Sequence, residues 1–266
     1  MVTYPSIIGA KAKRSAVVRM AGRLEGKVAL VTGSPPGGIG GAIADRFAAE
    51  GATVMRHDRT ADTASDSSAG AYAFVAADLE DPAACAALID ETVRRFGRLD
   101  ILVNNAALTT RSDLQTTDAA FFDTMMAVNV RAPLLLIQAA RPHFCAQGGG
   151  AVLNIGSVNA YRGGRNLLAY SISKGALMTL SRNLADALGA DHIRVNHFNV
   201  GWVLSASEQA LQENEGRPAD WAKRVPFPSG RLLTPDEIAS FAVTFVEEGG
   251  GHVSGSVVDL EQHPVR

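Results

Sequence analysis

Cysteine is scarce in this chain of 266 residues, which contains only Cys85 and Cys145. Two cysteines this far apart form neither a disulfide framework nor the close pairs of a zinc site. Both lie in segments with helical periodicity. We therefore expect two buried thiols in a reducing cytosol, a cytoplasmic protein and no metal site.

An excess of charge of one sign is also absent. The chain has 25 basic and 27 acidic side chains, for a net charge of −2. Because a nucleic-acid surface needs a strong positive field, this balance argues against nucleic acid as a partner. Apolar runs are short as well: even Ala132 to Ala140 contains Gln138, and no run reaches the length of a membrane span. We therefore expect no membrane partner.

The N-terminal residues lack helical and strand periodicity. We interpret residues 1–23 as a flexible extension that precedes a single catalytic domain at 24–266. Met20 could be a second natural start, which would make residues 1–19 a dispensable appendage. The alternative is a short organelle-targeting leader, whereas a signal peptide would need a longer apolar core and a cleavage site.

From residue 27 onward, short apolar runs alternate regularly with segments of helical period. The runs predict strands at residues 28–31, 53–55, 72–75, 101–103, 151–155, 193–195 and 256–258. Helix signals recur between them, such as Asp81 before Pro82 and the capping box of Thr234 and Glu237. This alternation predicts an α/β fold, with one doubly wound parallel sheet of about seven strands and helices on both faces.

Two polar stretches interrupt the alternation. Residues 60–70 are rich in Ser, Asp and Ala and predict a flexible surface loop. Residues 203–230, with Trp202 and Trp221 as anchors, separate a strand from a helix at the edge where such sheets bind ligands. A long insertion there is a candidate substrate lid. The alternative is a helical excursion with no gating role.

A glycine-rich turn follows the first strand and opens a helix. Glycines at Gly33, Gly38 and Gly40 would let the backbone approach a pyrophosphate, and the helix N-terminus supplies N–H donors. Asp58 follows the second strand, 18 residues beyond Gly40, where a carboxylate can accept from an adenosine ribose. Asp78 follows the third strand at the same edge, within reach of an adenine. Each aspartate alone would suit a solvated strand end, but together with the glycines they predict a dinucleotide site.

Tyr170 and Lys174 are four residues apart in a predicted helix and therefore share one face. A phenol with a pKa near ~10 becomes a useful base if an adjacent ammonium and a positive nicotinamide lower that pKa. Ser157 ends the fifth strand, where its hydroxyl could hydrogen-bond a substrate oxygen. Asn105 and Ala106 end the fourth strand beside the expected cofactor.

Asn129 lies inside a helix predicted to run from about Thr117 past Leu136. Its carbonyl would normally accept from the residue four positions later, but that residue is Pro133, which has no N–H. The free carbonyl could hold a water that passes protons toward Lys174. The alternative is an ordinary proline kink.

These features together resemble the short-chain dehydrogenase/reductase family, from Leu24 to about Leu260. The resemblance is carried by Val31-Thr-Gly, Gly38-Ile-Gly40, Asp78-Leu79, Phe96 to Ala106, Asn129-Val130, Ser157, Tyr170-Ser-Ile-Ser-Lys174 and Ile193-Arg-Val-Asn196. It implies a Rossmann-type fold, a homotetramer or homodimer, and a catalytic tetrad of Asn129, Ser157, Tyr170 and Lys174, with Lys174 also holding the nicotinamide ribose. The implied cofactor site comprises Gly33, Gly38, Ile39, Gly40, Asp58, Asp78, Leu79, Asn105, Ala106, Tyr170, Lys174, Gly201 and Val203.

The glycine turn departs from the family pattern. Four residues, including Pro35 and Pro36, separate Gly33 from Gly38 where three are usual. The two prolines remove two N–H groups that could bind phosphate. This insertion bears on cofactor affinity and leaves the catalytic groups intact.

The leading functional hypothesis is an NAD-dependent oxidoreductase that interconverts a secondary alcohol and a ketone. NAD is expected because Asp58 would repel a 2′-phosphate, although His57 and Arg59 could soften that discrimination, so NADP is not excluded. Four residues between Ser157 and Tyr170 hint at a sugar, sugar acid or hydroxy acid, unless they form a solvated loop: Asn159, Arg162, Arg165 and Asn166. The alternatives are an NADPH-dependent 3-oxoacyl-thioester reductase and a non-catalytic dinucleotide-sensing regulator.

Overall fold

Seven strands rich in apolar residues pair in parallel to form one sheet. The computed structural model describes residues 22–60, 72–218, 220–225, 227, 229–248 and 252–262. The sheet has the order β3-β2-β1-β4-β5-β6-β7, which confirms the predicted doubly wound α/β fold. The strands are β1 (Val28–Val31), β2 (Thr53–Asp58), β3 (Tyr72–Ala76), β4 (Ile101–Asn104), β5 (Gly150–Ser157), β6 (Ile193–Val200) and β7 (Val257–Leu260).

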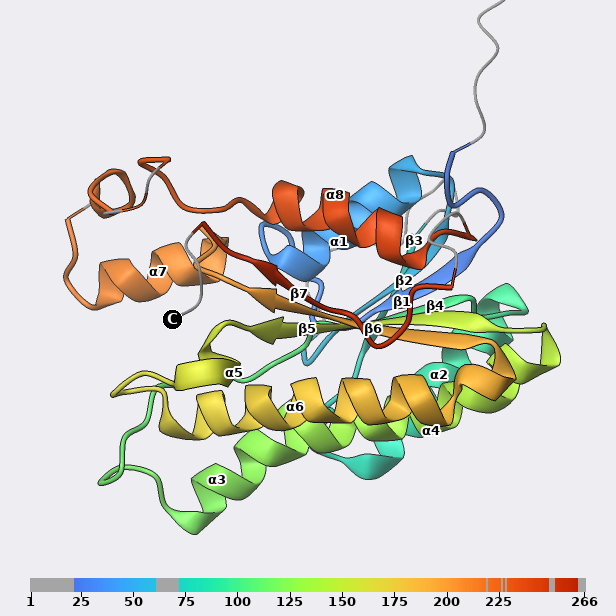
Figure 1. Ribbon diagram of the computed structural model, residues 1–266, viewed down its shortest axis with the longest axis horizontal. Helices are drawn as coiled ribbons and strands as arrows, with labels where there is room; N and C mark the ends of the chain where they lie inside the picture. The colour runs from blue at the N-terminus through green and yellow to red at the C-terminus, as the bar shows by residue number, and fades with distance from the viewer. Residues whose placement is uncertain are drawn as a thin grey trace, which may run out of the picture.

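Helices cover both faces of this sheet (Figure 1). One face carries α1 (Ile39–Ala49) and α8 (Pro235–Val246), which pack side by side. The opposite face carries α2 (Pro82–Phe96), α4 (Ala132–Ala146) and α6 (Leu168–Ala187). The remaining helical segments are α3 (Ala119–Met126), the π-helical turn η1 (Ala127–Arg131), α5 (Asn159–Arg162), η2 (Gly189–Asp191), α7 (Ala206–Asn214) and η3 (Trp221–Lys223).

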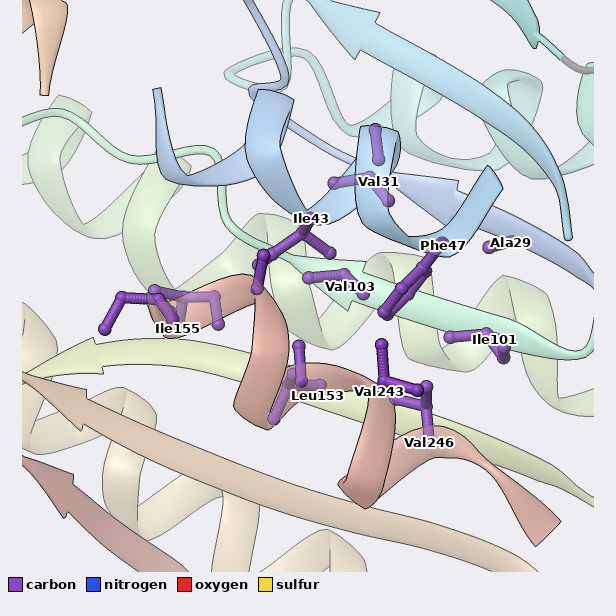
Figure 2. Packing of buried hydrophobic residues seen from close by; sticks show 14 of the residues in the cluster. Ala29, Val31, Ile43, Phe47, Ile101, Val103, Leu153, Ile155, Val243 and Val246 are labelled. Carbon is purple, nitrogen blue, oxygen red and sulfur yellow. The ribbon is translucent and has the colours of Figure 1, made fainter. Parts of the chain in front are cut away.

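Because both faces are covered, most strand residues are buried, and two separate apolar cores result, one on each face of the sheet. In the core under α1 and α8, the side chains of Phe47 and Val243 meet those of Val103 and Leu153 from the sheet (Figure 2). Phe47 is fully buried. Burying a side chain of that size contributes roughly 1.5–3 kcal/mol, so this core fixes α1, and with it the glycine turn at its N-terminus.

The helix predicted from Thr117 past Leu136 is interrupted. Asp118 caps α3 by accepting from the Phe121 N–H, and the chain then widens into the π turn η1 before α4. There the Ala132 N–H donates to the carbonyl of Ala127, because Pro133 cannot supply the next α-helical bond.

The helical residues Ala119–Ala146, taken with their π turn, are long and apolar enough to cross a membrane by length and composition, with a mean hydropathy of 1.4 in an 18-residue window. The segment contains no long uninterrupted apolar run, because Asp123, Arg131 and Arg141 divide it. Its second half, α4, packs against α2 and the sheet, as a core helix does.

The two cysteines differ in their surroundings. Cys85 in α2 is buried, as expected. Cys145, in the last turn of α4, is exposed, so the expectation of a second buried thiol is wrong. Residues 1–21 and 61–71 lie outside the described residues. The expected N-terminal extension, most of the predicted surface loop and the domain boundary therefore stay predictions.

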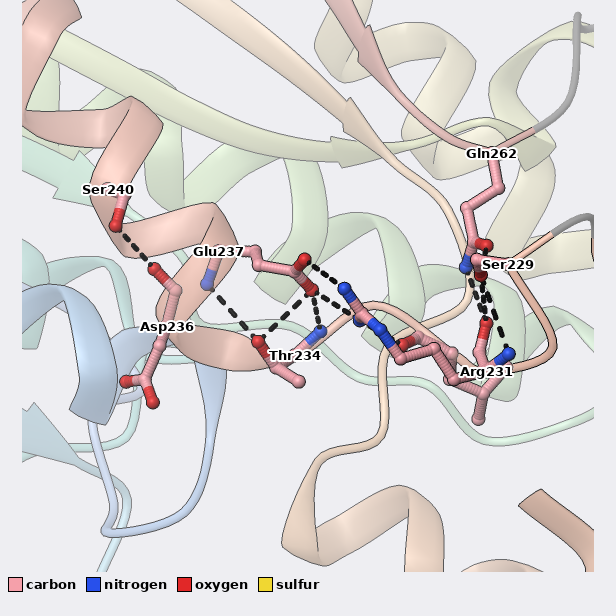
Figure 3. Close-up of polar contacts among 8 residues, drawn as sticks. Ser229, Arg231, Thr234, Asp236, Glu237, Ser240 and Gln262 are labelled. Carbon is pink, nitrogen blue, oxygen red and sulfur yellow. Dashed lines mark hydrogen bonds and ion pairs between the residues drawn. The ribbon is translucent and has the colours of Figure 1, made fainter. Parts of the chain in front are cut away.

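Both ends of α8 are capped by side chains. At its start, Thr234 accepts from the Glu237 N–H, and the Glu237 carboxylate accepts from the Thr234 N–H at 2.8 Å, which confirms the predicted capping box. Arg231 adds two hydrogen bonds to the same carboxylate, at 2.6 and 2.9 Å (Figure 3). At the helix end, the Arg194 guanidinium donates to the Phe245 and Glu247 carbonyls.

We predict that Glu237→Gln destabilises the fold in a pH-dependent way. The hydrogen bonds from Arg231, followed by the Thr234 N–H, lower the pKa of Glu237 to about 2. A lowered carboxyl pKa stabilises the fold above the unfolded-state pKa of about 4.3, and this contribution is lost as the pH falls toward 2. Because the side chain is partly exposed, we expect a loss of about 1 kcal/mol at pH 7. Urea unfolding at several pH values measures it, and a loss that stayed constant down to pH 3 would contradict the assignment.

Candidate active site

The candidate site lies at the carboxyl edge of the sheet, between β1 and β4. The strand order reverses there, because β1 pairs with β2 on one side and β4 on the other. Chains leaving the two strands turn in opposite directions, and the crevice between them is where open α/β sheets bind ligands.

Thr32 joins the two loops that leave β1 and β4. Its hydroxyl donates to the Val103 carbonyl and accepts from the N–H groups of Asn105 and Ala106, both at 3.1 Å. The Asn105 amide in turn donates to the carbonyls of Thr32 and Gly33. These bonds bring the predicted cofactor residues Gly33, Asn105 and Ala106 together.

The glycine turn is packed so closely that side chains would not fit. A Cβ at Gly33, where φ is +59°, would lie 2.6 Å from the Cα of Ala106. A Cβ at Gly40 would lie 2.2 Å from the Gly33 carbonyl oxygen. Gly38, the N-cap of α1, has no side chain to cap the first N–H groups, which include those of Ile39 and Gly40. This uncapped helix start and bare turn fit a pyrophosphate.

The proline insertion folds back on the helix it precedes. The Pro35 carbonyl accepts from the Gly38 N–H at 3.3 Å, and Gly37 adopts a φ of +76°. The Gly37 carbonyl accepts from the N–H of Ala206, the first residue of α7. The insertion therefore joins the glycine turn to the segment predicted as a lid.

His57 and Asp58 end β2 with different roles. His57 is buried: its Nδ1 accepts from the Gly33 N–H at 3.3 Å, and its Nε2 donates to the Ala77 carbonyl at 3.0 Å. Burial lowers the pKa of His57, so the ring is neutral and structural. It therefore does not soften cofactor discrimination, and Arg59, which is exposed, is the remaining cation at this strand end. The Asp58 carboxylate accepts from the Arg59 N–H at 2.7 Å.

The other predicted cofactor residues lie at the same edge of the sheet. Asp78 is exposed after β3, and its carboxylate accepts from the Glu80 N–H, while Leu79 is buried. After β6, the Gly201 N–H donates to the Leu260 carbonyl, and Val203 is buried in a parallel bridge with Leu233.

Tyr170 and Lys174 share one face of α6, as expected. Lys174 is buried, with its Nζ 5.6 Å from the centre of the Tyr170 ring and donating to the Ile155 carbonyl at 2.9 Å. Ser157, at the end of β5, lies beside them, and its Oγ accepts from the Asn159 N–H at 3.2 Å.

The pKa values of these groups are set mainly by burial. Burial lowers the pKa of Lys174 to about 8. The pKa of Tyr170 is raised: burial is the largest cause, a hydrogen bond with Ser157 opposes it, and the charge of Glu208 adds to it. The neutral phenol, which can donate a proton, is therefore the favoured form at neutral pH.

Asn129 positions its neighbours with its side chain. Its Oδ1 accepts from the Leu108 N–H at 2.8 Å, and its Nδ2 donates to the Leu108 carbonyl and to Ser173 Oγ, both at 3.0 Å. The Ser173 hydroxyl donates to the Tyr170 carbonyl at 2.7 Å. Asn129 thus ties the loop after β4 to α6. A water at its own carbonyl stays a prediction.

A buried polar chain that the sequence analysis missed runs beneath this site. His197 of β6 contacts Ser181 Oγ through Nδ1 and Asn199 Oδ1 through Nε2, both at 3.0 Å. Burial lowers the pKa of His197 to about 4, so the ring is neutral. A Cβ at Gly156 would lie 2.0 Å from His197 Nε2, so the histidine occupies space that this glycine leaves. Strand periodicity alone gives no sign of such a contact between neighbouring strands.

The predicted lid at 203–230 contains α7, which lies beyond the carboxyl ends of β5, β6 and β7 (Figure 1). Trp202 and Trp221 stack with ring centroids 5.3 Å apart. The sequence analysis missed Glu208, which accepts from the indole N–H of Trp202 at 2.8 Å. The Ser205-to-Glu208 spacing is that of a capping box and could have located the helix start. In the described part of the chain, no group of three or more His, Cys, Asp or Glu side chains could hold a metal ion.

Comparisons with known proteins find related oxidoreductases that match most of the chain. The chain matches the family profile described as Enoyl-(Acyl carrier protein) reductase over residues 35–261. It is 31% identical over 243 residues to the 2-dehydro-3-deoxy-D-gluconate 5-dehydrogenase of Escherichia coli, covering 90% of this chain and 95% of that protein. It is 34% identical over 240 residues to the D-threitol dehydrogenase of Mycolicibacterium smegmatis, covering 88% and 91%. A solved structure of an NAD(P)-dependent gluconate 5-dehydrogenase from Beutenbergia cavernae, with NADP at low occupancy, has a TM-score of 0.79 and 32% identity, covering 90% and 96%.

We predict that Gly40→Ala disrupts the cofactor site. The added methyl group would meet the Gly33 carbonyl and the Asn105 amide, so the turn must open. We expect a loss of roughly 1–3 kcal/mol in stability and a loss of cofactor binding. Thermal unfolding and titration of the cofactor by fluorescence measure the two effects. Gly189→Ala is the matched control, because nothing lies within 4 Å of the added Cβ and φ there is not positive. Undiminished cofactor affinity in Gly40→Ala would place the cofactor elsewhere.

Proposed function

Because this chain belongs to the short-chain dehydrogenase/reductase family, we propose that it transfers a hydride between NAD and a polar secondary alcohol or ketone, with Tyr170 as the acid–base group. The observation that carries the proposal is the grouping of Tyr170, Lys174 and Ser157 at the carboxyl end of β5, the strand that pairs with β4. The chain is an NAD(P)-dependent oxidoreductase, and its relatives include dehydrogenases of a sugar acid and of a polyol.

Tyr170, Ser157 and Lys174 each have a separate role in the proposed reaction. When bound, the nicotinamide exchanges a hydride with the substrate carbon and, in its oxidised form, contributes a positive charge. In reduction, Tyr170 gives its phenolic proton to the substrate oxygen, and Ser157 Oγ hydrogen-bonds the same oxygen. In oxidation, the phenolate of Tyr170 removes the hydroxyl proton. Lys174 supplies the positive charge that stabilises the phenolate.

The raised pKa of Tyr170 favours the acid role. Since reduction uses the neutral phenol, its rate should hold through neutral pH, whereas oxidation uses the phenolate and should rise toward alkaline pH.

NAD is supported by the end of β2. The Asp58 carboxylate can accept from ribose hydroxyls and would repel a 2′-phosphate, and the glycine turn at 33–40 contains no Lys or Arg. His57 is neutral and buried, which leaves only Arg59 to attract a phosphate at this strand end. The NADP bound by the Beutenbergia cavernae protein is the counter-argument, and the cofactor ratio tests it.

The two alternatives explain fewer observations. An NADPH-dependent 3-oxoacyl-thioester reductase would need cations for the 2′-phosphate, which the glycine turn does not offer. A dinucleotide-sensing regulator has no use for a buried Lys174 beside Tyr170.

The cellular setting and the assembly are also part of the proposal. We infer a cytoplasmic enzyme, in keeping with the free Cys85 and Cys145. We infer a closed symmetric homotetramer or homodimer, supported by apolar side chains left exposed on the two helix layers, Ile172 on α6 and Phe241 on α8.

Tyr170→Phe should abolish most of the turnover while sparing cofactor binding. The change removes one oxygen and keeps the ring, so packing survives, but the substrate oxygen loses its acid–base partner. We expect the turnover number to fall by roughly 10²-fold or more, measured in steady state with the preferred substrate. Tyr161→Phe is the matched control, because its hydroxyl donates to Asp259 and takes no part in the proposed chemistry. Near-normal turnover in Tyr170→Phe would refute the mechanism.

Asp58→Ala should narrow the preference for NAD. The wild type is expected to have the higher kcat/KM with NAD. Removal of the charge should raise kcat/KM for NADP relative to NAD by about tenfold or more. Asp90→Ala, an exposed charge removal on α2, should leave the ratio unchanged. A wild-type preference for NADP would overturn the cofactor assignment while leaving the role of Tyr170 intact.

A further inference from the structure

Both ends of α7 are held by contacts with loops of the candidate site. At its start, the Ala206 N–H donates to the carbonyl of Gly37 in the glycine turn. Just past its end, Glu215 forms an ion pair with Arg111 of the loop that follows β4, at 3.0 Å. The helix therefore spans from the expected cofactor turn to the loop that Asn129 helps to hold. The face of α7 that carries Glu208 lies within electrostatic range of Tyr170.

That face carries polar side chains where a helix usually buries apolar ones. Glu208 and Gln212 are one turn apart, and Gln212 is 1% exposed. The Gln212 amide Nε2 donates to Glu208 Oε1 at 2.7 Å, which fixes the orientation of the amide. Its other end, Oε1, is buried without a hydrogen-bond partner. A buried acceptor of this kind normally has a donor, so the position calls for one from outside the chain.

Glu208 adds a second acceptor beside the first. Its Oε1 accepts from the Trp202 indole and from Gln212, whereas no side chain in the described part donates to its Oε2. The charge of Glu208 also reaches Tyr170, where it raises the pKa of the phenol after the larger effect of burial. The carboxylate thus lies within electrostatic range of the reacting oxygen.

The cations near the lid are already engaged or point to solvent. Arg111 pairs with Glu215, and Arg217 lies over the Trp202 and Trp221 rings, 5.6 and 5.8 Å from their centroids. Arg162, the last residue of α5, and Arg165, in the loop before α6, first suggested an anionic substrate, and both are exposed. The described part of residues 203–230 therefore offers acceptors to a substrate, while its Arg217 and Arg224 are engaged and its Lys223 is exposed.

We propose that Glu208 and Gln212 select a neutral polyhydroxylated substrate, such as a polyol or its ketose, by accepting hydrogen bonds from its hydroxyl groups, and reject the corresponding sugar acid. The hydroxyl groups of a polyol can donate to both acceptors. A substrate carboxylate can only accept, and it would meet the Glu208 charge in a covered site. This inference rests on the proposed function and narrows its substrate class. Within it, Glu208 and Gln212 are specificity residues.

The test compares matched pairs of substrates in the wild type and in Glu208→Gln. The pairs are a polyol and the aldonic acid of equal length, with four, five and six carbons, such as D-glucitol and D-gluconate. We expect the wild type to prefer the polyol by about tenfold or more in kcat/KM. Glu208→Gln should lower kcat/KM for the polyol, raise it for the acid and so narrow the ratio. Glu213→Gln removes a charge from the exposed face of α7 and should change kcat/KM for neither the polyol nor the acid.

The pH profile supplies a readout that a merely structural role would not move. Tyr170 is faced by Ser157 from β5, by Lys174 from its own helix and by Glu208 from α7. Removing the Glu208 charge should lower the pKa of Tyr170 and shift the rising limb of oxidation to lower pH, whereas Glu213→Gln should leave it in place.

The outcomes separate this inference from the proposed function. A wild-type preference for the acids overturns the inference and leaves the dehydrogenase assignment standing. The same holds if Glu208→Gln changes neither the polyol-to-acid ratio of kcat/KM nor the pH at which the oxidation rate rises. Turnover of an acyl thioester and of none of the pairs overturns both.

Discussion

The hydroxyl of Thr32 holds together the ends of β1 and β4, the two strands from which the chain departs in opposite directions. Because a parallel sheet binds ligands at such a reversal, the geometry of the cofactor crevice depends on this contact. Asn105 extends it by donating to the carbonyls of Thr32 and Gly33, and the absence of a side chain at Gly40 lets α1 approach. The rest of the candidate site is built outward from this junction.

The acid–base residues are held by longer connections. Asn129 reaches from a π turn to Leu108 and Ser173, and Ser173 in turn bonds the carbonyl of Tyr170. The π turn arises because Pro133 cannot continue the α-helical bonding. The π turn between α3 and α4 therefore carries the side chain, Asn129, that fixes the position of α6.

Local patterns in the sequence predicted the fold well. The helix α2 has its cap at Asp81 and its stop at Gly97, and both signals act over a few residues. The spacing of Tyr170 and Lys174 likewise fixes their shared face. Contacts between distant segments could not be predicted in this way. The interruption at Ala127–Arg131, the burial of His57 between the loops that follow β1 and β3, and the effect of the Glu208 charge on Tyr170 depend on tertiary packing.

The raised pKa of Tyr170 could not be predicted from local sequence patterns either. The sequence shows that Lys174 is near, but burial of both groups depends on the assembled fold. That burial also lowers the pKa of Lys174 to about 8, so the charged ammonium still predominates at neutral pH.

The contact between Gly156 and His197 has a consequence for how this sequence can change over time. Any side chain at position 156 would collide with the imidazole, so a bulky residue at 156 and a histidine at 197 exclude one another. The residues allowed at one of these positions therefore depend on the residue at the other, although the two positions lie on neighbouring strands. In a lineage that acquires this pair one substitution at a time, the glycine has to come first, and reversal has to begin with loss of the histidine.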